Sequence, residues 1–580
     1  MTRLVTFAGW KKARRVRHVV VLVLMLSGVL GCNEEPATAP SPPSQVTDVH
    51  TVQPPSRPKS RVGPELPIHL DAVFDAIPSD TPYYWVSIAD SNRRELSVNL
   101  DDWSNLYESF ANAIQDTLRR EEVPFGKLLS GFLDALRGRF DAEGLAELGM
   151  LPTPKFALYG IGAFPALRFE LADAKRFDAL LDRIEAETAQ TSESLEIDEW
   201  TFRVFRADGW SLAVVITPNE ASMMLAPNVV LADLLPILVG RERRVDSIGD
   251  TDELQALTER MDGGASAMSF FSIDLLGLAS AIAGVDKKGL VAQTLDQWGV
   301  PILSADCTKD FLRLAKIVPR IYYLAFDARG KQSGRFFIDF GKDALELNLL
   351  KLQRLTEKRQ KGWAEPPIAF LNAFPQLVET KRVLEAIESK LRDVPLKCEP
   401  LLPLNALAEL TPSEFLVAIP PVRGFSVLIQ DWRLTPLGLS ELRASVALHT
   451  LKPEVQLEKL FPELPQKPQR GVPLSSFGVT LPLLGGFTYQ LENDLLLFAS
   501  DGKNLDALKA SLTPMKEGVA PFVEVGFDYG EVLKGFGSLS STVQSELIEL
   551  QERFAHFGMF TVSLSFTESG AEITYELVVN

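Results

Sequence analysis

Two stretches of this chain alternate apolar and polar residues on either side of a turn, which is the pattern of a β-hairpin. They cover residues 320–340 and 560–579 and align without gaps at an offset of 240, so that Tyr322 falls on Val562 and Gly330 on Gly570. In the second stretch one side is entirely apolar and the other carries hydroxyl residues. This contrast predicts a sheet with one buried face and one wetted face, as antiparallel sheets commonly have. The apolar positions are Phe560, Val562, Leu564 and Phe566.

Three further correspondences precede this one along the chain, and both copies keep the same order. From the N-terminus toward the C-terminus their offset falls from 277 to 254, as the intervening loops differ in length. A falling offset with a constant order indicates an old duplication, with chance similarity between apolar strands as the alternative. We therefore predict two related halves, residues 69–341 and 342–580. The matched segments are 166–184 with 443–461, Leu225-Ala226 with Phe498-Ala499, and the strands that end at Asp274 and Asp528.

Each half also contains a helix with a single apolar stripe. Asp173 can cap a helix over residues 173–187, in which Phe177, Leu180, Leu181 and Ile184 repeat with helical spacing. Such a stripe packs on a sheet. The predicted fold class is therefore α+β, with each half a mostly antiparallel sheet that has helices on one face.

The N-terminal segment has the features of a targeting signal. Six Lys and Arg residues and no acid lie within residues 3–17, and the apolar run Val19–Leu26 follows, which together are typical of a secretory signal peptide over residues 1–31. The segment ends in Gly31-Cys32 and resembles the lipobox of bacterial lipoproteins, which implies that Cys32 is acylated and becomes the mature N-terminus. The alternatives are a plain signal peptide cut nearby, an uncleaved anchor, or a twin-arginine signal at Arg14-Arg15.

Residues 32–68 are predicted to form a disordered tether, because nine prolines and many small polar residues leave too little apolar surface to fold. Beyond the signal peptide the charge is strongly acidic. The whole chain has 59 Lys+Arg against 76 Asp+Glu, and loss of the six N-terminal cations changes the net charge from −17 to −23. Such a surface repels phosphate backbones, so we predict no nucleic-acid partner. The acyl chains on Cys32 would then hold the protein at the membrane.

Two further cysteines, Cys307 and Cys398, lie 91 residues apart. An exported chain with two such thiols most often pairs them in an oxidising compartment, so we predict a Cys307–Cys398 disulfide. Two separate buried thiols are the alternative. A redox-active pair is disfavoured because the Cys-x-x-Cys spacing is absent.

Motifs that carry chemistry are missing from the sequence. The mature chain has four histidines, His50, His69, His449 and His556, and no two have the spacing of metal ligands. We also find no nucleophile elbow, phosphate loop or dinucleotide fingerprint. The sequence therefore predicts no catalytic residue, no metal and no cofactor. A further set of aromatic residues either forms core or lines a carbohydrate or lipid site. These are Tyr83, Tyr84, Trp85, Trp103, Trp200 and Trp210.

Two short segments carry a family resemblance. Residues 77–83, Ile-Pro-Ser-Asp-Thr-Pro-Tyr, and residues 246–254, which precede a predicted helix, resemble elements of an uncharacterised family of bacterial envelope proteins, often lipoproteins, that carry a domain of unknown function. The resemblance implies a location in the cell envelope and supplies no catalytic residue.

The functional expectation follows from these points. We expect a non-enzymatic lipoprotein of the outer membrane, which Asn33 after the cysteine favours, facing the periplasm or the cell surface. Its body would bind an envelope protein or an apolar ligand, because something must cover the sheet face that the helices leave open. The alternatives are a periplasmic carrier or assembly factor for lipids or lipoproteins, and an enzyme of an unrecognised type.

Overall fold

The computed structural model divides the chain into two compact units, and each is described here by itself. Unit 1 comprises Met1–Thr81 and Val86–Met268, and unit 2 comprises Pro82–Trp85 and Ser269–Asn580. The predicted signal peptide, tether and lipidation site Cys32 lie outside the described residues. The structure describes residues 72–87, 111–112, 115, 125–139, 141–152, 154–241, 246–251, 267–285, 289–298, 304–328, 331–345, 349–352, 367–374, 377–406, 423–435, 438–450, 452–460, 488–492, 494–511, 521–535 and 557–579.

Unit 1 contains an antiparallel sheet in the strand order β2-β3-β7-β6-β5-β4. Strand β2 is buried at every position, so its two faces both lie in the core. At the other end, β4 is mostly exposed and carries two glutamates, a common way to keep an edge strand from pairing with other chains. The strands are β2 (Phe156–Ile161), β3 (Phe164–Glu170), β4 (Glu193–Ile197), β5 (Trp200–Ala207), β6 (Trp210–Ile216) and β7 (Glu220–Pro227).

The helices of unit 1 pack through the apolar positions that the sequence indicates. In α6 (Ala174–Thr188), Phe177, Leu180 and Ile184 are buried, and the ring of Phe177 meets that of Phe169 edge-on at 5.5 Å. The side chain of Asp173 caps α6 by accepting the backbone N–H groups of Lys175 and Arg176, as predicted. The other helical elements of unit 1 are α2 (Ala72–Asp75), α4 (Gly126–Leu136), α5 (Ala142–Glu147), α7 (Asn228–Leu238) and the 3₁₀ helix η1 (Ile248–Asp250).

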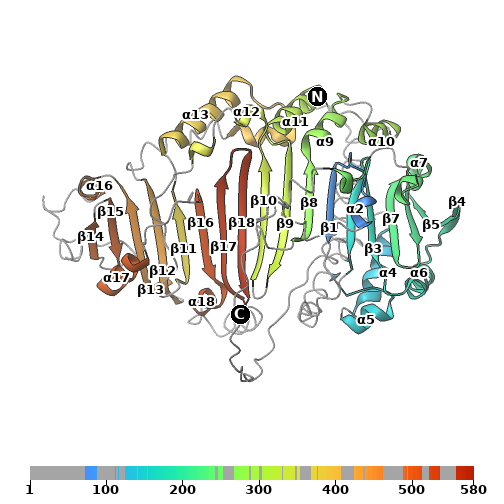
Figure 1. The fold of residues 1–580 in the computed structure, drawn as a ribbon, viewed down its shortest axis with the longest axis horizontal. Helices are drawn as coiled ribbons and strands as arrows, with labels where there is room; N and C mark the ends of the chain where they lie inside the picture. Colours follow the sequence, from blue (N-terminus) through green and yellow to red (C-terminus); the bar gives the residue numbers. More distant parts are fainter. Residues whose placement is uncertain are drawn as a thin grey trace, which may run out of the picture. The chain divides into compact units, whose positions relative to one another are not determined.

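Unit 2 contains a longer antiparallel ladder (Figure 1), and its strand order is β9-β10-β18-β17-β16-β11-β12-β13-β15-β14. The border between the units passes through β1 (Tyr83–Ser87) and β8 (Ala267–Asp274). The other strands are β9 (Arg320–Ala328), β10 (Lys331–Asp339), β11 (Ala369–Ala373), β12 (Gly424–Thr435), β13 (Gly438–His449), β14 (Thr488–Glu492), β15 (Leu495–Ala499), β16 (Val523–Asp528), β17 (Phe557–Phe566) and β18 (Gly570–Val579).

Among the described residues of unit 2, helices bury part of this sheet. The buried cluster around Phe370, Leu428 and Leu497 includes Leu505 and Leu508 of α17 (Gly502–Ser511), so α17 covers one face of the sheet near β13 and β15. The other helical elements are α9 (Leu275–Ile282), α10 (Leu290–Trp298), α11 (Ala305–Ile317), α12 (Lys342–Leu345), η2 (Leu349–Leu352), α13 (Leu377–Asp393), η3 (Glu399–Asn405), α16 (Pro453–Leu460) and α18 (Tyr529–Lys534).

The α+β class and the antiparallel sheets confirm the fold prediction at this level. The compact units divide at Met268, whereas the sequence placed the boundary between its halves at residue 341, and the two halves stay a prediction.

Each unit contains one similar chain path. The strand order is β2-β3-β7-β6 in unit 1 and β12-β13-β15-β14 in unit 2. In each case two hairpins are joined through their inner strands. A helix follows the first hairpin, α6 in unit 1 and α16 in unit 2. The duplication itself stays a prediction.

The strand registers correct the sequence alignment of the two hairpins by one residue. Tyr322 pairs with Phe337, fifteen positions later, and the residue of the second hairpin with a partner at the same separation is Thr561, which pairs with Glu576. Tyr322 therefore corresponds to Thr561 and not to Val562. Because side chains alternate between faces, a slip of one residue moves every side chain to the opposite face of the sheet.

Gly149 offers a test of the packing in unit 1. Its φ is +79°, and a Cβ atom there would lie 2.3 Å from the backbone oxygen of Asp173 and 2.6 Å from the backbone nitrogen of Phe177, at the start of α6. We expect Gly149→Ala to lower the free energy of unfolding by about 1–2 kcal/mol for the left-handed backbone and a further ~1–3 kcal/mol for the displaced helix. Urea denaturation followed by circular dichroism measures the loss.

Gly138 provides the matched control. Its φ is +66°, but no atom lies within 4 Å of the position that a Cβ would occupy. Gly138→Ala should therefore show only the backbone cost. Equal losses in the two variants would contradict the packing of α6 against Gly149.

Candidate functional site

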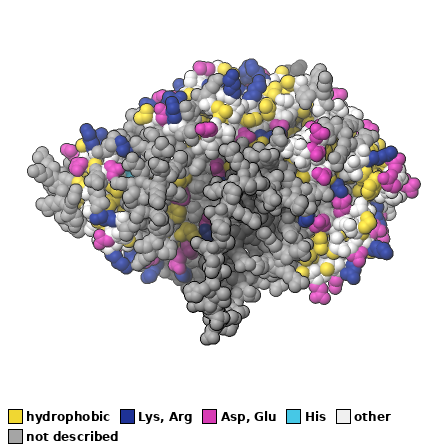
Figure 2. Space-filling view, viewed as in Figure 1, with side chains coloured by type: hydrophobic (Ala, Val, Ile, Leu, Met, Phe, Trp, Pro, Cys, Tyr) yellow, Lys and Arg dark blue, Asp and Glu magenta, His cyan; other side chains and the backbone are white. Residues whose placement is uncertain are grey.

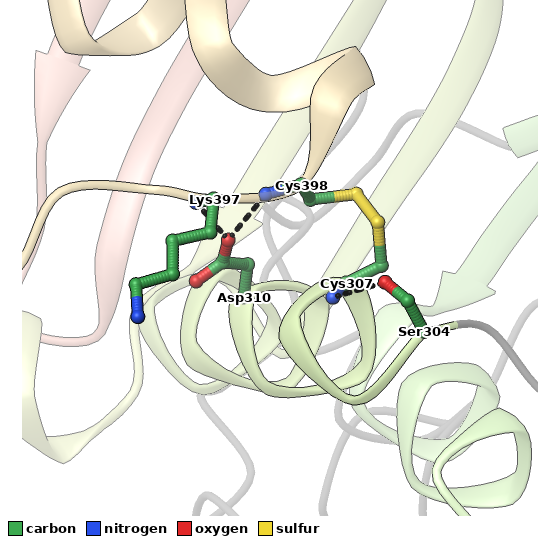
Figure 3. The surroundings of a disulfide bond; sticks show 5 residues. All are labelled: Ser304, Cys307, Asp310, Lys397 and Cys398. Carbon is green, nitrogen blue, oxygen red and sulfur yellow. Dashed lines mark hydrogen bonds between the residues drawn. A yellow bond between two sulfur atoms is a disulfide. The ribbon is translucent and has the colours of Figure 1, made fainter. Parts of the chain in front are cut away.

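The disulfide between Cys307 and Cys398 is present and joins α11 to the start of η3 within unit 2 (Figure 3). The two Cα atoms lie 4.3 Å apart, and Cys398 is only 1% exposed. The side chain of Ser304 accepts the backbone N–H of Cys307 and caps α11. The cross-link thus starts from a well-defined helix end.

Hydrogen bonds hold the same connection in place beside the disulfide. Asp310, which is 5% exposed, accepts the backbone N–H groups of Lys397 and Cys398 at 2.6 and 2.8 Å through one carboxylate oxygen (Figure 3). Arg313 donates to the backbone oxygens of Lys390 and Val394 at the end of α13. A buried carboxylate is stable when backbone N–H groups bind it, so Asp310 belongs to a structural clamp.

The clamped connection presents aliphatic side chains to solvent. Val394, Leu402 and Leu404 are 49, 45 and 39% exposed. Figure 2 shows hydrophobic side chains at the surface along the upper edge of the view, where Figure 1 places α11, α12 and α13. Lysine and arginine side chains stand among them, so this surface is mixed in character.

A larger apolar surface follows from the strand registers of unit 2. On strands β9, β10, β18, β17 and β16, one face has apolar or aromatic residues at nearly every described position, and we call it the apolar face. Two of its members are distinctly exposed, Phe336 by 38% and Val525 by 41%. The apolar face comprises Ile321, Tyr323, Ala325, Gly334, Phe336, Ile338, Ala571, Ile573, Tyr575, Leu577, Phe560, Val562, Leu564, Phe566, Val523, Val525 and Phe527.

The opposite face of these strands carries most of their charges and, on β9 and β10, the buried side chains of Tyr322, Leu324 and Phe337. Lys331 pairs with Glu576 at 2.6 Å, and Arg335 lies 3.6 Å from Glu572. The hydroxyls of Ser563 and Thr574 bond to each other at 2.5 Å. The sequence predicted a buried apolar face and a wetted polar face on the closing hairpin. The structure confirms the sorting, but the apolar positions of β17 from Phe560 to Phe566 are only half-buried.

Six aromatic rings form a continuous row across the apolar face, which we call the aromatic strip. Tyr323 lies 4.4 Å from Phe336 and 6.4 Å from Tyr575, measured between ring centroids. The row continues from Tyr575 to Phe560 at 6.3 Å and from Phe560 to Phe527 at 5.5 Å.

The strip ends at Tyr529 of α18, whose ring lies 4.9 Å from that of Phe527. The strip therefore runs from β9 to the start of α18.

Gly334 leaves room for the ring of Tyr575 where the strip crosses β10. A Cβ atom at this position would lie 2.3–2.7 Å from the ring carbons and hydroxyl oxygen of Tyr575, so the ring of Tyr575 rests directly on the glycine backbone. This placement lets Tyr575 reach past β10, and its hydroxyl bonds to that of Tyr323 on β9 at 2.6 Å. A glycine within a strand often marks such a close approach. No signal in the sequence singled out Gly334 or Tyr575.

In the part of the chain that the structure describes, the other candidate positions show no convergence of reactive groups. His449 lies at the end of β13 with its ring edge-on to Phe374 at 5.2 Å, while His50, His69 and His556 lie outside the described residues. Within the described ranges, no group of three or more His, Cys, Asp or Glu residues could hold a metal ion. Burial raises the pKa of Tyr159 in β2 to about 12, as expected for a hydroxyl in a core.

The aromatic residues that the sequence emphasised have different roles. Tyr84 and Trp210 are 2 and 7% exposed and belong to the core, and the indole N–H of Trp85 donates to Ser269 at 2.6 Å. Trp103 lies outside the described residues. In the part of the chain that the structure describes, no helix is long and apolar enough to cross a membrane.

Comparisons with known proteins give limited information. No family model matches the chain, and no curated protein matches it. Among solved structures, crystal form I of TP0453, a Treponema lipoprotein, is similar over 49% of this chain and 86% of its own, with 8% identity and a TM-score of 0.23. Crystal form III covers 50% and 89%, with 9% identity and a TM-score of 0.22. We base no conclusion on a similarity this distant, and the family resemblance stays a prediction.

The disulfide should stabilise unit 2 chiefly through the unfolded chain. Closing a loop of 91 residues corresponds to roughly 4–5 kcal/mol in the chain-entropy model. We expect the double variant Cys307→Ser, Cys398→Ser to unfold at a markedly lower urea concentration than the oxidised protein. Addition of dithiothreitol to the oxidised protein should produce the same shift, and dithiothreitol should leave the double variant unchanged. An unaltered midpoint in the double variant would show that the cross-link adds no stability.

Proposed function

We propose that the protein is a membrane-anchored bacterial lipoprotein with a non-enzymatic role, and that the apolar face of unit 2 binds an apolar ligand or a partner protein in the cell envelope. The anchor rests on Cys32 and the signal segment before it. The location we propose is the outer membrane, with the body in the periplasm or at the cell surface.

The exposed apolar face carries this proposal. Monomeric soluble proteins rarely expose large contiguous apolar areas, and such areas mark binding sites. Phe336 and Val525 lie on strands β10 and β16, and half-buried apolar residues occupy the strands between them. Each of these side chains stands on the same face as the aromatic strip. A surface of this kind lowers its free energy when an occupant removes it from water.

The described residues favour binding over catalysis. Apart from Asp327 at the end of the β9–β10 hairpin, the charged residues of these strands lie on the opposite face, where Lys331 pairs with Glu576 and Arg335 with Glu572. A catalytic centre needs acids, bases or nucleophiles that converge on one place. The apolar face offers two tyrosine hydroxyls, and these bond to each other.

Val525→Asp tests the proposal. The test uses the chain without residues 1–32, which contains all described residues, exported to a bacterial periplasm and purified without detergent. Native mass spectrometry with organic extraction should find an apolar molecule or a bound protein on the unaltered chain. A charge at position 525 should remove it, because a carboxylate cannot be buried without a partner.

Val378→Asp is the matched control, because Val378 is a valine of the same unit, lies on α13 and is 80% exposed. It should keep whatever the unaltered chain carries. Circular dichroism should show both variants folded. If Val525→Asp and Val378→Asp retain equal amounts of the bound species, the apolar face is not the binding site.

A further inference from the structure

We propose that the occupant of the apolar face is a hydrocarbon chain, the acyl chain of a neutral lipid, lying across the strands along the aromatic strip. This inference rests on the function proposed above and specifies the ligand of the same face. Charge, polar groups, length and shape of the strip all support it.

The charge of the face fits an uncharged occupant. The seventeen positions listed for the face include no Lys, Arg, Asp or Glu, and the register adds one acidic position, Asp327 opposite Gln332, at the end of the β9–β10 hairpin. The same five strands carry Arg335, Glu524 and Glu572 on their other side. Protein–protein interfaces form about one hydrogen bond per 100–200 Å² and are enriched in arginine. The hydroxyls of Tyr323 and Tyr575 bond to each other at 2.6 Å, so each of these polar groups has a partner within the strip. A hydrocarbon chain, which has neither charge nor hydrogen-bonding groups, matches such a surface.

The length of the strip fits one acyl chain. It crosses five neighbouring strands, β9, β10, β18, β17 and β16, and strands in a sheet lie about 4.8 Å apart, which gives roughly 19 Å. The hydrocarbon core of a bilayer is about 30 Å thick, so a chain that fills one leaflet is about 15 Å long. The strip can therefore cover such a chain from end to end.

The shape of the strip fits a chain lying flat. The ring of Tyr575 rests on Gly334 and stands nearly parallel to the ring of Tyr323, with an angle of 13° between them. A Cβ at position 334 would displace the ring of Tyr575 and interrupt the strip in its middle.

The experiment measures displacement of the neutral fluorophore Nile red from the chain without residues 1–32 by monoacylglycerols from monooctanoin to monoarachidin, each below its aggregation limit. A neutral head group avoids repulsion by the acidic protein, whose full chain has a net charge of −17. Affinity should rise by up to fourfold per methylene, which corresponds to about 0.8 kcal/mol. It should stop rising once the chain is longer than the strip. Affinity that does not depend on chain length, or that rises without a plateau, would overturn the inference.

Two variants locate the site. Gly334→Ala should weaken the binding of the longer monoacylglycerols by at least tenfold and affect monooctanoin least. Gly502→Ala is the control, because Gly502 is the first residue of α17 and has no atom within 4 Å of a Cβ position. Equal affinities of the Gly334→Ala variant and the unaltered chain would overturn the placement on the strip.

The outcomes also separate this inference from the proposed function. If Val525→Asp removes a bound protein and monoacylglycerols do not compete for the face, the face binds a partner and the acyl-chain inference is wrong. If the chain sediments with phosphatidylcholine vesicles but shows no saturable displacement of Nile red, the face contacts a bilayer surface and the inference is also wrong. If Val525→Asp changes none of these measurements, both proposals fail.

Discussion

The antiparallel backbone ladder of unit 2 determines which side chains share a face, and the apolar face exists because of that ladder. Side chains directly opposite each other in two paired strands point to the same side, as Tyr323 and Phe336 do. Repeated over five strands, this rule collects the half-exposed aromatic and aliphatic residues on one side, whereas the other side carries the ion pairs together with the buried Leu324 and Phe337. Most segments that form the face are far apart in the sequence, so the register is what brings the aromatic strip together.

The disulfide and Asp310 act on a different part of the same unit. Together with Arg313 they fix the connection between α13 and η3 against α11. This connection carries exposed aliphatic residues beside the buried Leu396 and Cys398, and the disulfide and hydrogen bonds offset part of the entropy cost of ordering it. The disulfide and the buried carboxylate of Asp310 thus hold the same connection, although the two cysteines are 91 residues apart in the sequence.

Local sequence patterns correctly predicted a helix cap, a buried helix stripe and the disulfide, because in each case the residue type has one usual structural role. Asp173 capped its helix, the stripe through Phe177 was buried, and the two body cysteines were paired. The pattern of the closing hairpin also predicted which residues share a face. It could not predict that the apolar side is half-exposed, because exposure depends on whether helices from elsewhere in the chain cover it.

The aromatic strip could not be predicted from the sequence, because it depends on how distant segments of the chain pair. Its rings come from β9, β10, β16, β17 and β18 and from α18, and none of these segments looks unusual alone. The position of Gly334 under Tyr575 depends on the pairing of β10 with β18, which joins residues more than 200 positions apart.

The division of the chain has a consequence for biosynthesis. Unit 2 includes the four residues Pro82–Trp85, although the rest of it begins only at Ser269, and Trp85 bonds to Ser269 across 184 residues. At roughly 5–20 residues per second, the ribosome needs about 10–40 s to make the intervening segment. The whole sequence of unit 1 is therefore made before unit 2 can close. No single cut in the gene separates the units, so shortened forms of this protein must keep the early strand.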